Sequence, residues 1–299
     1  MPGNTITPNP DTLKKYNADV YDDASDIYDT YEGLFFPYLF GRIRELVADR
    51  FIPSLPNDAV VLDVGCGTGQ QTLLFREKGI AVVGVDISAG LVRVANEKIG
   101  ENICMVSDAC RLPFVDGVFD AVSCAGSTLN HIPDYGCFFD EVARVLKPGG
   151  YIFLESDNKW RPDMFWCLLS CMAGDPLQYH EKLGHVIGYF KRPLSEGYPY
   201  VFPLSFGEGK VRELNLRTFT CKELYKELGA RGCKVEKVYG IHAITNVLPS
   251  PLMIQDHPGK ITTAVFKFLA FFENRLYGLW PINRVGMSVI VFARKNAPK

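Results

Sequence analysis

Short apolar runs alternate with amphipathic stretches from residue 59 onward, and this alternation restricts the fold more than any other feature of the chain. The runs AVVLDVG (59–65) and IAVVGVDI (80–87) have the character of strands, and the helical segments after them end at Gly79 and Gly100. Glycine tolerates the positive φ of a helix C-cap. The order is β-α-β-α, which predicts a parallel sheet covered by helices.

Further apolar runs continue the same pattern. Strands are expected at 103–109, 119–126 and 151–156, with the helix DYGCFFDEVARVL between the last two. Near the C-terminal end, Thr220-x-x-Glu223 has the form of a capping box and predicts the start of a helix. The strands CKVEKVYG and MSVIVFAR follow this helix. The chain is therefore expected to be an α/β protein.

Composition restricts the partners and the compartment. Hydrophobic residues make up 47% of the chain, charged residues 22%, and the net charge is -2. This balance differs from that of a disordered tail or a nucleic-acid-binding surface, so we expect no nucleic-acid partner. The nine cysteines include no C-x-x-C pair and no histidine cluster accompanies them. We expect no metal, reduced thiols and a cytoplasmic location.

Leader and membrane segments are also not expected. The first residues, MPGNTITPNPD, lack the basic and apolar regions of a signal peptide. No apolar run approaches the roughly 18 residues of a membrane span.

A glycine turn follows the first strand. The sequence Asp63-Val64-Gly65-Cys66-Gly67-Thr68-Gly69 leads into a helix, and such a turn lets the backbone approach a ligand closely with its amides exposed. Asp86 ends the second strand, at the spacing where a carboxylate accepts both hydroxyls of an adenosine ribose. A nicotinamide dinucleotide fingerprint would need Gly or Ala at position 70, where this chain has Gln70.

Four segments in order carry a family resemblance: VLDVGCGTG, VVGVDIS, SDACRLPFVDGVFDAV and RVLKPGGYIFLE. Together they resemble the class I S-adenosylmethionine-dependent methyltransferases. The resemblance implies a Rossmann-like sheet of seven strands with the last one antiparallel, helices on both faces, and S-adenosylmethionine as cofactor with S-adenosylhomocysteine as product. It also implies cofactor contacts from Asp63, Gly65, Cys66, Gly67, Gly69, Asp86, Ile87, Ser88, Asp108 and Ala109.

The implied contacts have a physical basis. The resemblance puts the glycine turn at the methionine moiety, Asp63 at its ammonium, Asp86 at the ribose, and Asp108 with Ala109 at the adenine. The cofactor carries a sulfonium and an ammonium but no phosphate, so carboxylates beside a glycine turn attract it. An alternative role for Asp63 is to cap the next helix from the end of its strand.

The segment CAGSTLNHIPD (124–134) follows the fourth strand, where cofactor and acceptor should meet. It is similar to segments of glycine and sarcosine N-methyltransferases and of quinone C-methyltransferases. This similarity implies that Ala125 and Gly126 line the cofactor and that His131 faces the reaction site. His131 could instead cap a helix or fill space.

The N-terminal spacing Tyr21-x-x-Ala24-x-x-Tyr28 is similar to a tyrosine motif that closes over the cofactor in relatives. The alternative is that Tyr21 and Tyr28 anchor a surface helix to the core.

Methyl transfer is an in-line displacement that needs alignment, exclusion of water and, for some acceptors, a base. The candidate bases are His131, His185, Glu155 and Asp157, and we take the two histidines as the catalytic candidates. Only His131 lies in a recognised motif.

Two segments interrupt the alternation after C-terminal strand ends, where ligands bind in open α/β sheets, so we expect them to roof the site. The predicted organisation is an N-terminal helical cap (1–50), the cofactor-binding core (51–156), a substrate-side insertion (157–218), a continuation of the core (219–240), an apolar, mainly helical lid insertion (241–286), and the final strand with its tail (287–299).

Aromatic residues are concentrated in the insertions. In the second insertion Val265, Phe268, Leu269, Phe272, Leu276 and Leu279 fall at helical spacing, and Phe266, Phe271 and Trp280 widen the apolar face. Three interpretations stay open: a cover packed on the core, a pocket for a greasy acceptor, or a membrane-surface helix over 261–280 with Lys260, Lys267, Arg275 and Arg284 near lipid headgroups.

The preferred function is methyl transfer to an oxygen, carbon or nitrogen atom of a small lipophilic molecule, such as a quinone, a lipid or another secondary metabolite. The alternatives are a non-catalytic module that binds S-adenosylmethionine and an NAD-binding Rossmann protein. The apolar helix could also form a subunit interface, so both monomer and homodimer stay open.

Overall fold

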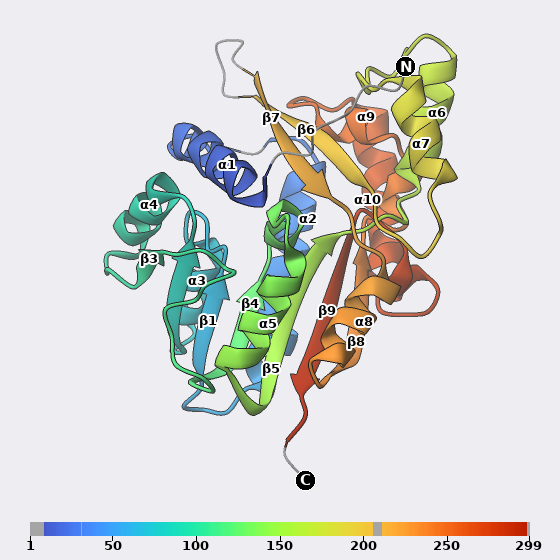
Figure 1. The fold of residues 1–299 in the computed structure, drawn as a ribbon. Helices are drawn as coiled ribbons and strands as arrows, with labels where there is room; N and C mark the ends of the chain where they lie inside the picture. The colour runs from blue at the N-terminus through green and yellow to red at the C-terminus, as the bar shows by residue number, and fades with distance from the viewer. Residues whose placement is uncertain (1–8, 31, 206–210, 298–299) are drawn as a thin grey trace.

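The structure, a computed structural model, describes residues 9–30, 32–205 and 211–297. Its centre is a seven-stranded sheet in the order β3-β2-β1-β4-β5-β9-β8 (Figure 1). All strands run parallel except β9, which is antiparallel to both of its neighbours. The predicted sheet with its last strand antiparallel is confirmed. The strands are β1 (Val60–Val64), β2 (Ala81–Asp86), β3 (Cys104–Val106), β4 (Phe119–Cys124), β5 (Leu146–Asp157), β8 (Cys233–Ile241) and β9 (Ser288–Lys295).

Helices cover both faces of the sheet. On one face, α5 (Tyr135–Val145) and α8 (Cys221–Ala230) bury residues such as Phe138 and Leu224 against the strands. On the other face, α2 (Phe35–Leu46) and α3 (Gln70–Glu77) pack residues such as Ile43 and Phe75. Successive residues of one strand serve opposite faces, as the pleat of a sheet requires: Leu62 belongs to the first core and Val61 to the second.

Helix ends follow the predicted signals. Ser88 caps α4 (Ala89–Ile99) by accepting a hydrogen bond from the Leu91 amide at 3.1 Å, and Gly100 ends this helix in the left-handed conformation. Thr220 and Glu223 form both hydrogen bonds of the capping box at the start of α8. Local sequence therefore sets the helix boundaries in the core.

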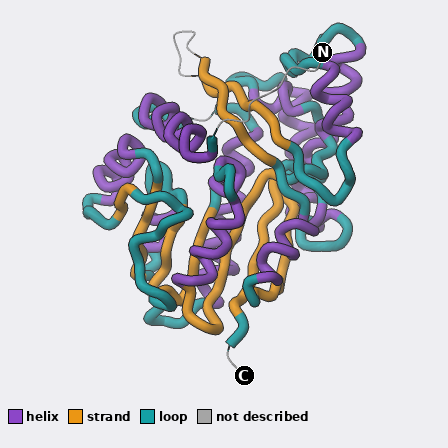
Figure 2. The backbone as a smooth tube through the Cα atoms, in the orientation of Figure 1, coloured by secondary structure: helices purple, strands orange, loops and turns teal. Residues whose placement is uncertain are grey.

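The first insertion contains an element absent from the predicted ones. After α6 (Asp163–Met172) and α7 (Leu183–Lys191), the strands β6 (Pro199–Ser205) and β7 (Val211–Arg217) form a separate antiparallel ribbon beyond the main sheet (Figure 2). Prolines at 199 and 203 argue against a strand in a larger sheet, but a two-stranded ribbon consists only of edges, which accept proline.

The second insertion holds the short helix α9 (Ser250–Ile254) and the long helix α10 (Lys260–Leu276). Within the described ranges, none of the helices has the length and hydropathy needed to cross a membrane.

One pair of cysteines differs from the prediction. Cys110 and Cys137 form a disulfide, so the expectation of reduced thiols is wrong for this pair. Cys110 follows β3 and Cys137 lies on α5, 27 residues further along the chain, and the fold brings them together. Their spacing carries no motif, so sequence alone gives no sign of the bond.

Candidate active site

A cavity of about 360 Å³ lies where β1, β2 and β4 end, and the helix α1 (Pro10–Ala24) lies across this edge of the sheet (Figure 1). Open α/β sheets bind their ligands at this edge. Most of the residues proposed from the sequence line the cavity: Tyr21, Tyr28, Asp63, Gly65, Cys66, Gly67, Asp86, Ile87, Asp108, Ala109, Ala125, Gly126 and His131.

The glycine turn forms the floor of the cavity in a left-handed backbone conformation. Gly65 has φ of 70° and Gly67 has φ of 52°. A Cβ atom on Gly65 would lie 2.2 Å from the side chain of Thr128, whereas one on Gly67 would meet no atom within 4 Å. Gly65 is therefore needed for close packing, and Gly67 leaves its space open to a ligand.

Gly69 and Ser88 lie outside the cavity and have structural contacts instead. Gly69 has φ of 79°, and a Cβ atom there would lie 3.0 Å from the Cβ of Ala95, so glycine permits α3 to approach α4. The Ser88 hydroxyl caps α4 and donates to Asp22 at 2.5 Å. Cofactor contacts of these two residues, implied by the resemblance, stay a prediction.

Asp86 stands between the glycine turn and the second helix. Its Oδ2 accepts from the Gly67 amide and its Oδ1 from the Ser88 amide, both at 2.9 Å. Burial raises the pKa of this carboxyl above its ordinary value despite these amides. Each oxygen keeps a lone pair, so the carboxylate can still accept from a diol.

Asp63 is placed both to contact a ligand in the cavity and to bind the start of the next helix, the two roles considered from the sequence. It lines the cavity, is 1% exposed, and accepts a hydrogen bond from the Thr72 hydroxyl of α3 at 2.7 Å. Burial raises the pKa of Asp63 to about 6. A cation beside it would favour its charged form, so the site suits an ammonium group.

The N-terminal segment, and not the described part of the two insertions expected to roof the site, contributes lining residues to the cavity, and polar contacts that the sequence does not reveal fasten it to the rim. The Lys14 ammonium lies 2.9 Å from the Asp108 carboxylate, and the Thr68 hydroxyl donates to Asp29 at 2.7 Å. Lys14 was missed because it belongs to no motif. The side of the cavity formed by α2, with Phe40, Ile43 and Arg44, was missed for the same reason.

His131 and Tyr21 face each other across the cavity mouth. The Tyr21 hydroxyl lies 2.8 Å from Nε2 of His131, and the rings meet edge to face at 5.3 Å. Burial lowers the pKa of His131 to about 3, so the ring is neutral at physiological pH. A neutral imidazole can accept a hydrogen bond from a ligand or from the tyrosine.

His185 is not part of this arrangement. It lies exposed on α7, outside the cavity lining, and its carbonyl accepts from the Tyr198 hydroxyl at 3.1 Å. The structure thus separates the two histidines proposed from the sequence, and His185 is withdrawn as a candidate base.

Glu155 and Asp157 lie behind the loop that carries His131, not in the cavity. Glu155 accepts from the Ser127 amide at 2.6 Å and from the Ser288 hydroxyl, and burial raises its pKa to about 7. Asp157 accepts from the Ser127 hydroxyl at 2.7 Å and from the Tyr200 hydroxyl at 2.5 Å. Ser127 is held at φ of 61°, unusual for a residue with a side chain. The two acids therefore position the loop.

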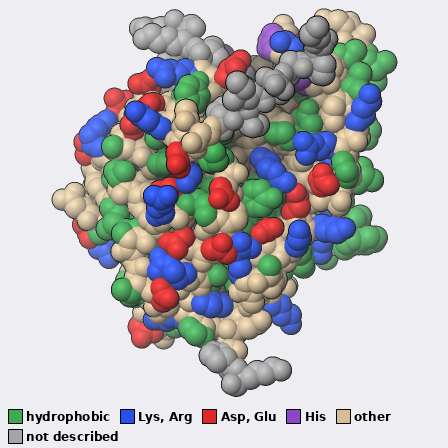
Figure 3. Space-filling model, viewed as in Figure 1, with side chains coloured by type: hydrophobic (Ala, Val, Ile, Leu, Met, Phe, Trp, Pro, Cys, Tyr) green, Lys and Arg blue, Asp and Glu red, His purple; other side chains and the backbone are tan. Residues whose placement is uncertain are grey.

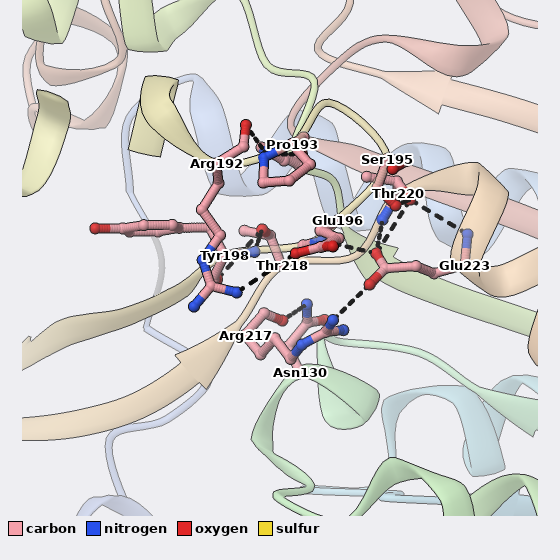
Figure 4. A network of polar contacts seen from close by, with 12 residues as sticks. Asn130, Arg192, Pro193, Ser195, Glu196, Tyr198, Arg217, Thr218, Thr220 and Glu223 are labelled. Carbon is pink, nitrogen blue, oxygen red and sulfur yellow. Dashed lines mark hydrogen bonds and ion pairs between the residues drawn. The ribbon is translucent and has the colours of Figure 1, made fainter. Parts of the chain in front are cut away.

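Asn130 connects the same loop to the first insertion. Its amide donates to the Arg217 carbonyl at 2.6 Å, and its side-chain oxygen accepts from the Asp157 amide at 2.9 Å. The network continues from the Arg217 guanidinium to Glu223 of the capping box (Figure 4). The end of the β6–β7 ribbon, the start of α8 and the residue before His131 are thus held together.

Residues 62–154 match the model of a methyltransferase domain. A 2-methyl-6-phytyl-1,4-hydroquinone methyltransferase of Synechocystis sp. is 36% identical over 123 residues, which cover 38% of this chain and 38% of that protein. A demethylmenaquinone methyltransferase of Symbiobacterium thermophilum is 31% identical over 162 residues, covering 50% of this chain and 63% of that protein. The chain thus spans less than two thirds of the length of either relative.

Among solved structures, the cyclase SpnF shares the fold over nearly the whole chain. Its TM-score is 0.59 at 21% identity, with 96% of this chain and 98% of SpnF covered. Residues 62–154 thus match a methyltransferase domain. The order of the strands and the cavity at their C-terminal ends agree with the fold that the resemblance to class I S-adenosylmethionine-dependent methyltransferases implies.

Proposed function

We propose that this protein transfers the methyl group of S-adenosylmethionine to a small lipophilic molecule, such as a quinone, a lipid or another secondary metabolite. One observation carries the proposal: three carboxylates, those of Asp63, Asp86 and Asp108, line one cavity beside an open glycine turn. Such a site attracts a cation and repels phosphates. It therefore suits a sulfonium cofactor and disfavours NAD.

The roles of the residues follow from their places. Asp63 would hold the ammonium, Asp86 the ribose hydroxyls, and Asp108 with Ala109 the adenine, while Gly67 leaves room for the methionine moiety. The bound cofactor supplies an electrophilic methyl group for an in-line displacement. The protein aligns the acceptor and excludes water beneath α1. His131 is the proposed catalytic residue: its neutral ring, with Nε2 2.8 Å from the Tyr21 hydroxyl, would orient the acceptor by a hydrogen bond.

Two observations support a lipophilic acceptor. The cavity lining also includes the apolar side chains of Phe40, Ile43 and Ile132. The relatives are named for a phytyl hydroquinone and a demethylmenaquinone, both with hydrocarbon tails. The acceptor atom would then be an oxygen or carbon of an aromatic ring.

A non-catalytic binding module is the second candidate, because SpnF, a protein named as a cyclase, has the same fold. Fold alone does not fix a reaction. The two candidates differ in turnover, so we would incubate the protein with methyl-labelled S-adenosylmethionine and demethylated quinones. Label in the organic phase is expected, and less of it with Asp86→Ala when the cofactor concentration is limiting. Cofactor binding without transfer to quinone, lipid or phenol extracts would favour the binding module.

A further inference from the structure

Three helices of the insertions expose large apolar side chains to solvent. On α10 these include Ile261, Phe268 and Phe271, which are 82%, 63% and 51% exposed. On α6, Phe165 and Met172 are 64% and 68% exposed. We name the exposed apolar side chains of α6, α7 and α10 the apolar face. In Figure 3, hydrophobic side chains gather along the right-hand edge, the side on which Figure 1 labels α6 and α7.

The apolar face is held rigidly from behind. The inner side of α10 buries Phe266 and Ala270 against Phe35 and Met253. The outer stripe, from Ile261 to Phe272, is therefore turned away from the core in a fixed orientation. The helix predicted from periodicity exists, and most of the apolar residues that fall at helical spacing in the sequence are exposed.

The helices of this face are joined to one another. The rings of Phe165 on α6 and Phe190 on α7 lie 5.5 Å apart. The Trp166 indole donates to the Val247 carbonyl at 2.8 Å, in the segment that leads to α9 and α10. These contacts join α6 and α7 to each other and to the segment that leads to α10, so the exposed residues of the three helices belong to one connected surface.

Charge is distributed unevenly on α10, all of whose residues are described. Its single acid, Glu273, is 1% exposed and points inward, accepting the amides of His242 and Ile244 at 2.7 Å. Its outer side carries Lys260, Lys267 and Arg275, and the Arg275 guanidinium lies 3.6 Å from the ring centre of Phe271. Aromatic and basic side chains without an exposed acid are typical of helices that lie in a membrane interface.

We propose that the apolar face docks on the surface of a lipid bilayer that contains anionic headgroups. Phenylalanine and isoleucine side chains would enter the boundary of the acyl chains, while Lys260, Lys267 and Arg275 reach the headgroups. The inference needs no methyl transfer, although a lipophilic acceptor of the proposed function would be met at this surface.

A second copy of the chain fits this face less well than a membrane does. In a two-fold interface through α10, Lys267 and Arg275 of one copy would face the same helix of the other copy, since such an interface opposes identical patches. The helix offers no exposed acid to pair with them. Anionic lipid supplies the missing negative charge.

The experiment is co-sedimentation of the full chain with phosphatidylglycerol-containing vesicles at low salt, with phosphatidylcholine vesicles in parallel. We expect the wild type to bind the anionic vesicles and the double variant Phe268→Glu/Phe271→Glu to lose about tenfold or more in affinity. The matched control is Val115→Glu, because Val115 is 73% exposed in the turn before β4. It should bind like the wild type.

Single charge reversals separate the contribution of basic side chains to vesicle binding from that of apolar side chains. Lys267→Glu is expected to weaken binding to anionic vesicles about fivefold or more, and Lys222→Glu on α8 should not. If a variant misfolds, fluorescence replaces it: with Trp160→Phe and Trp166→Phe, emission from Trp280, 80% exposed, should shift to the blue when vesicles are added.

Three results would overturn the inference. They are a wild type that stays in the supernatant at low salt, a Phe268→Glu/Phe271→Glu variant that binds as well as the wild type, and a wild-type dimer that this variant dissociates. Vesicle binding is measured without cofactor or acceptor. A chain that binds vesicles but never transfers methyl groups would contradict the proposed function and leave this inference standing.

Discussion

The structure of the cofactor half of the sheet depends on local sequence, whereas that of the two insertions depends on contacts between distant segments. In the segment from β1 to β4, turns, caps and strand-end carboxylates are local, so each residue's neighbours are close in the sequence. In the insertions, which surface a helix buries depends on partners far along the chain. Phe266 packs near Phe35, whereas periodicity alone left open whether the stripe of Phe268 and Phe272 packs on the core or faces outward. The sequence therefore identifies the helices and strands in both regions, but it identifies the buried side of a helix only in the first.

The largest effect is expected at the loop between the two regions. His131→Ala removes the neutral imidazole beside Tyr21, and turnover should fall about a hundredfold or more while cofactor binding is largely kept. His185→Ala is the control, since His185 lies exposed on α7. Steady-state kinetics of both variants check this. Equal turnover in His131→Ala and the wild type would leave His131 with a packing role only.

A pair of substitutions on α10 tests which of its sides is buried. Phe266→Ala should lower the free energy of unfolding by about 3 to 5 kcal/mol, because it empties a buried site that is 5% exposed. Phe268→Ala, at 63% exposure, should change it by about 0.5 kcal/mol or less. Urea denaturation of the two variants gives the comparison. The reverse order would mean that the stripe of Phe268 and Phe272 is the packed side.

The buried acids behind the His131 loop predict a pH dependence. Burial raises the pKa of Glu155 to about 7 from the usual 4.5, so the folded protein binds more protons than the unfolded chain between these values. The stability from protonated Glu155 is thus complete below pH 4.5 and lost as the pH rises through 7. Glu155→Gln should reduce this decline.

Urea titrations of wild type and Glu155→Gln at several pH values measure that effect. Asp63, whose pKa burial raises to about 6, contributes in the same direction, so Asp63→Asn is the companion variant. Identical pH profiles for Glu155→Gln and the wild type would show that Glu155 is ionised at little cost in the fold.

The smallest of these effects concerns cofactor affinity alone. Asp86→Ala removes a carboxylate placed to accept from the ribose, and a hydrogen bond to a charged acceptor is worth roughly 1.5 to 3 kcal/mol. Affinity should fall about tenfold or more. Asp58→Ala, an exposed acid before β1, is the control. If Asp86→Ala bound the cofactor as tightly as the wild type, the ribose would lie elsewhere.

Much of the cavity was predictable because its signals are short and local. Gly65, Gly67 and Asp86 lie within one β-α-β unit, whose geometry is stereotyped. Lys14, the α2 wall and the Glu155–Ser127 contact were not predictable, because they join distant segments without a motif. The Cys110–Cys137 bond and the β6–β7 ribbon were missed for related reasons: one depends on tertiary contact, and the other tolerates proline only as an isolated ribbon.

The most direct test of the central claim is calorimetric titration of the purified chain with S-adenosylmethionine and S-adenosylhomocysteine, with NAD as the control. The three carboxylates around the glycine turn predict binding of the first two in the micromolar range and no measurable binding of NAD. Binding of NAD alone would contradict the assignment and make the cavity a dinucleotide site.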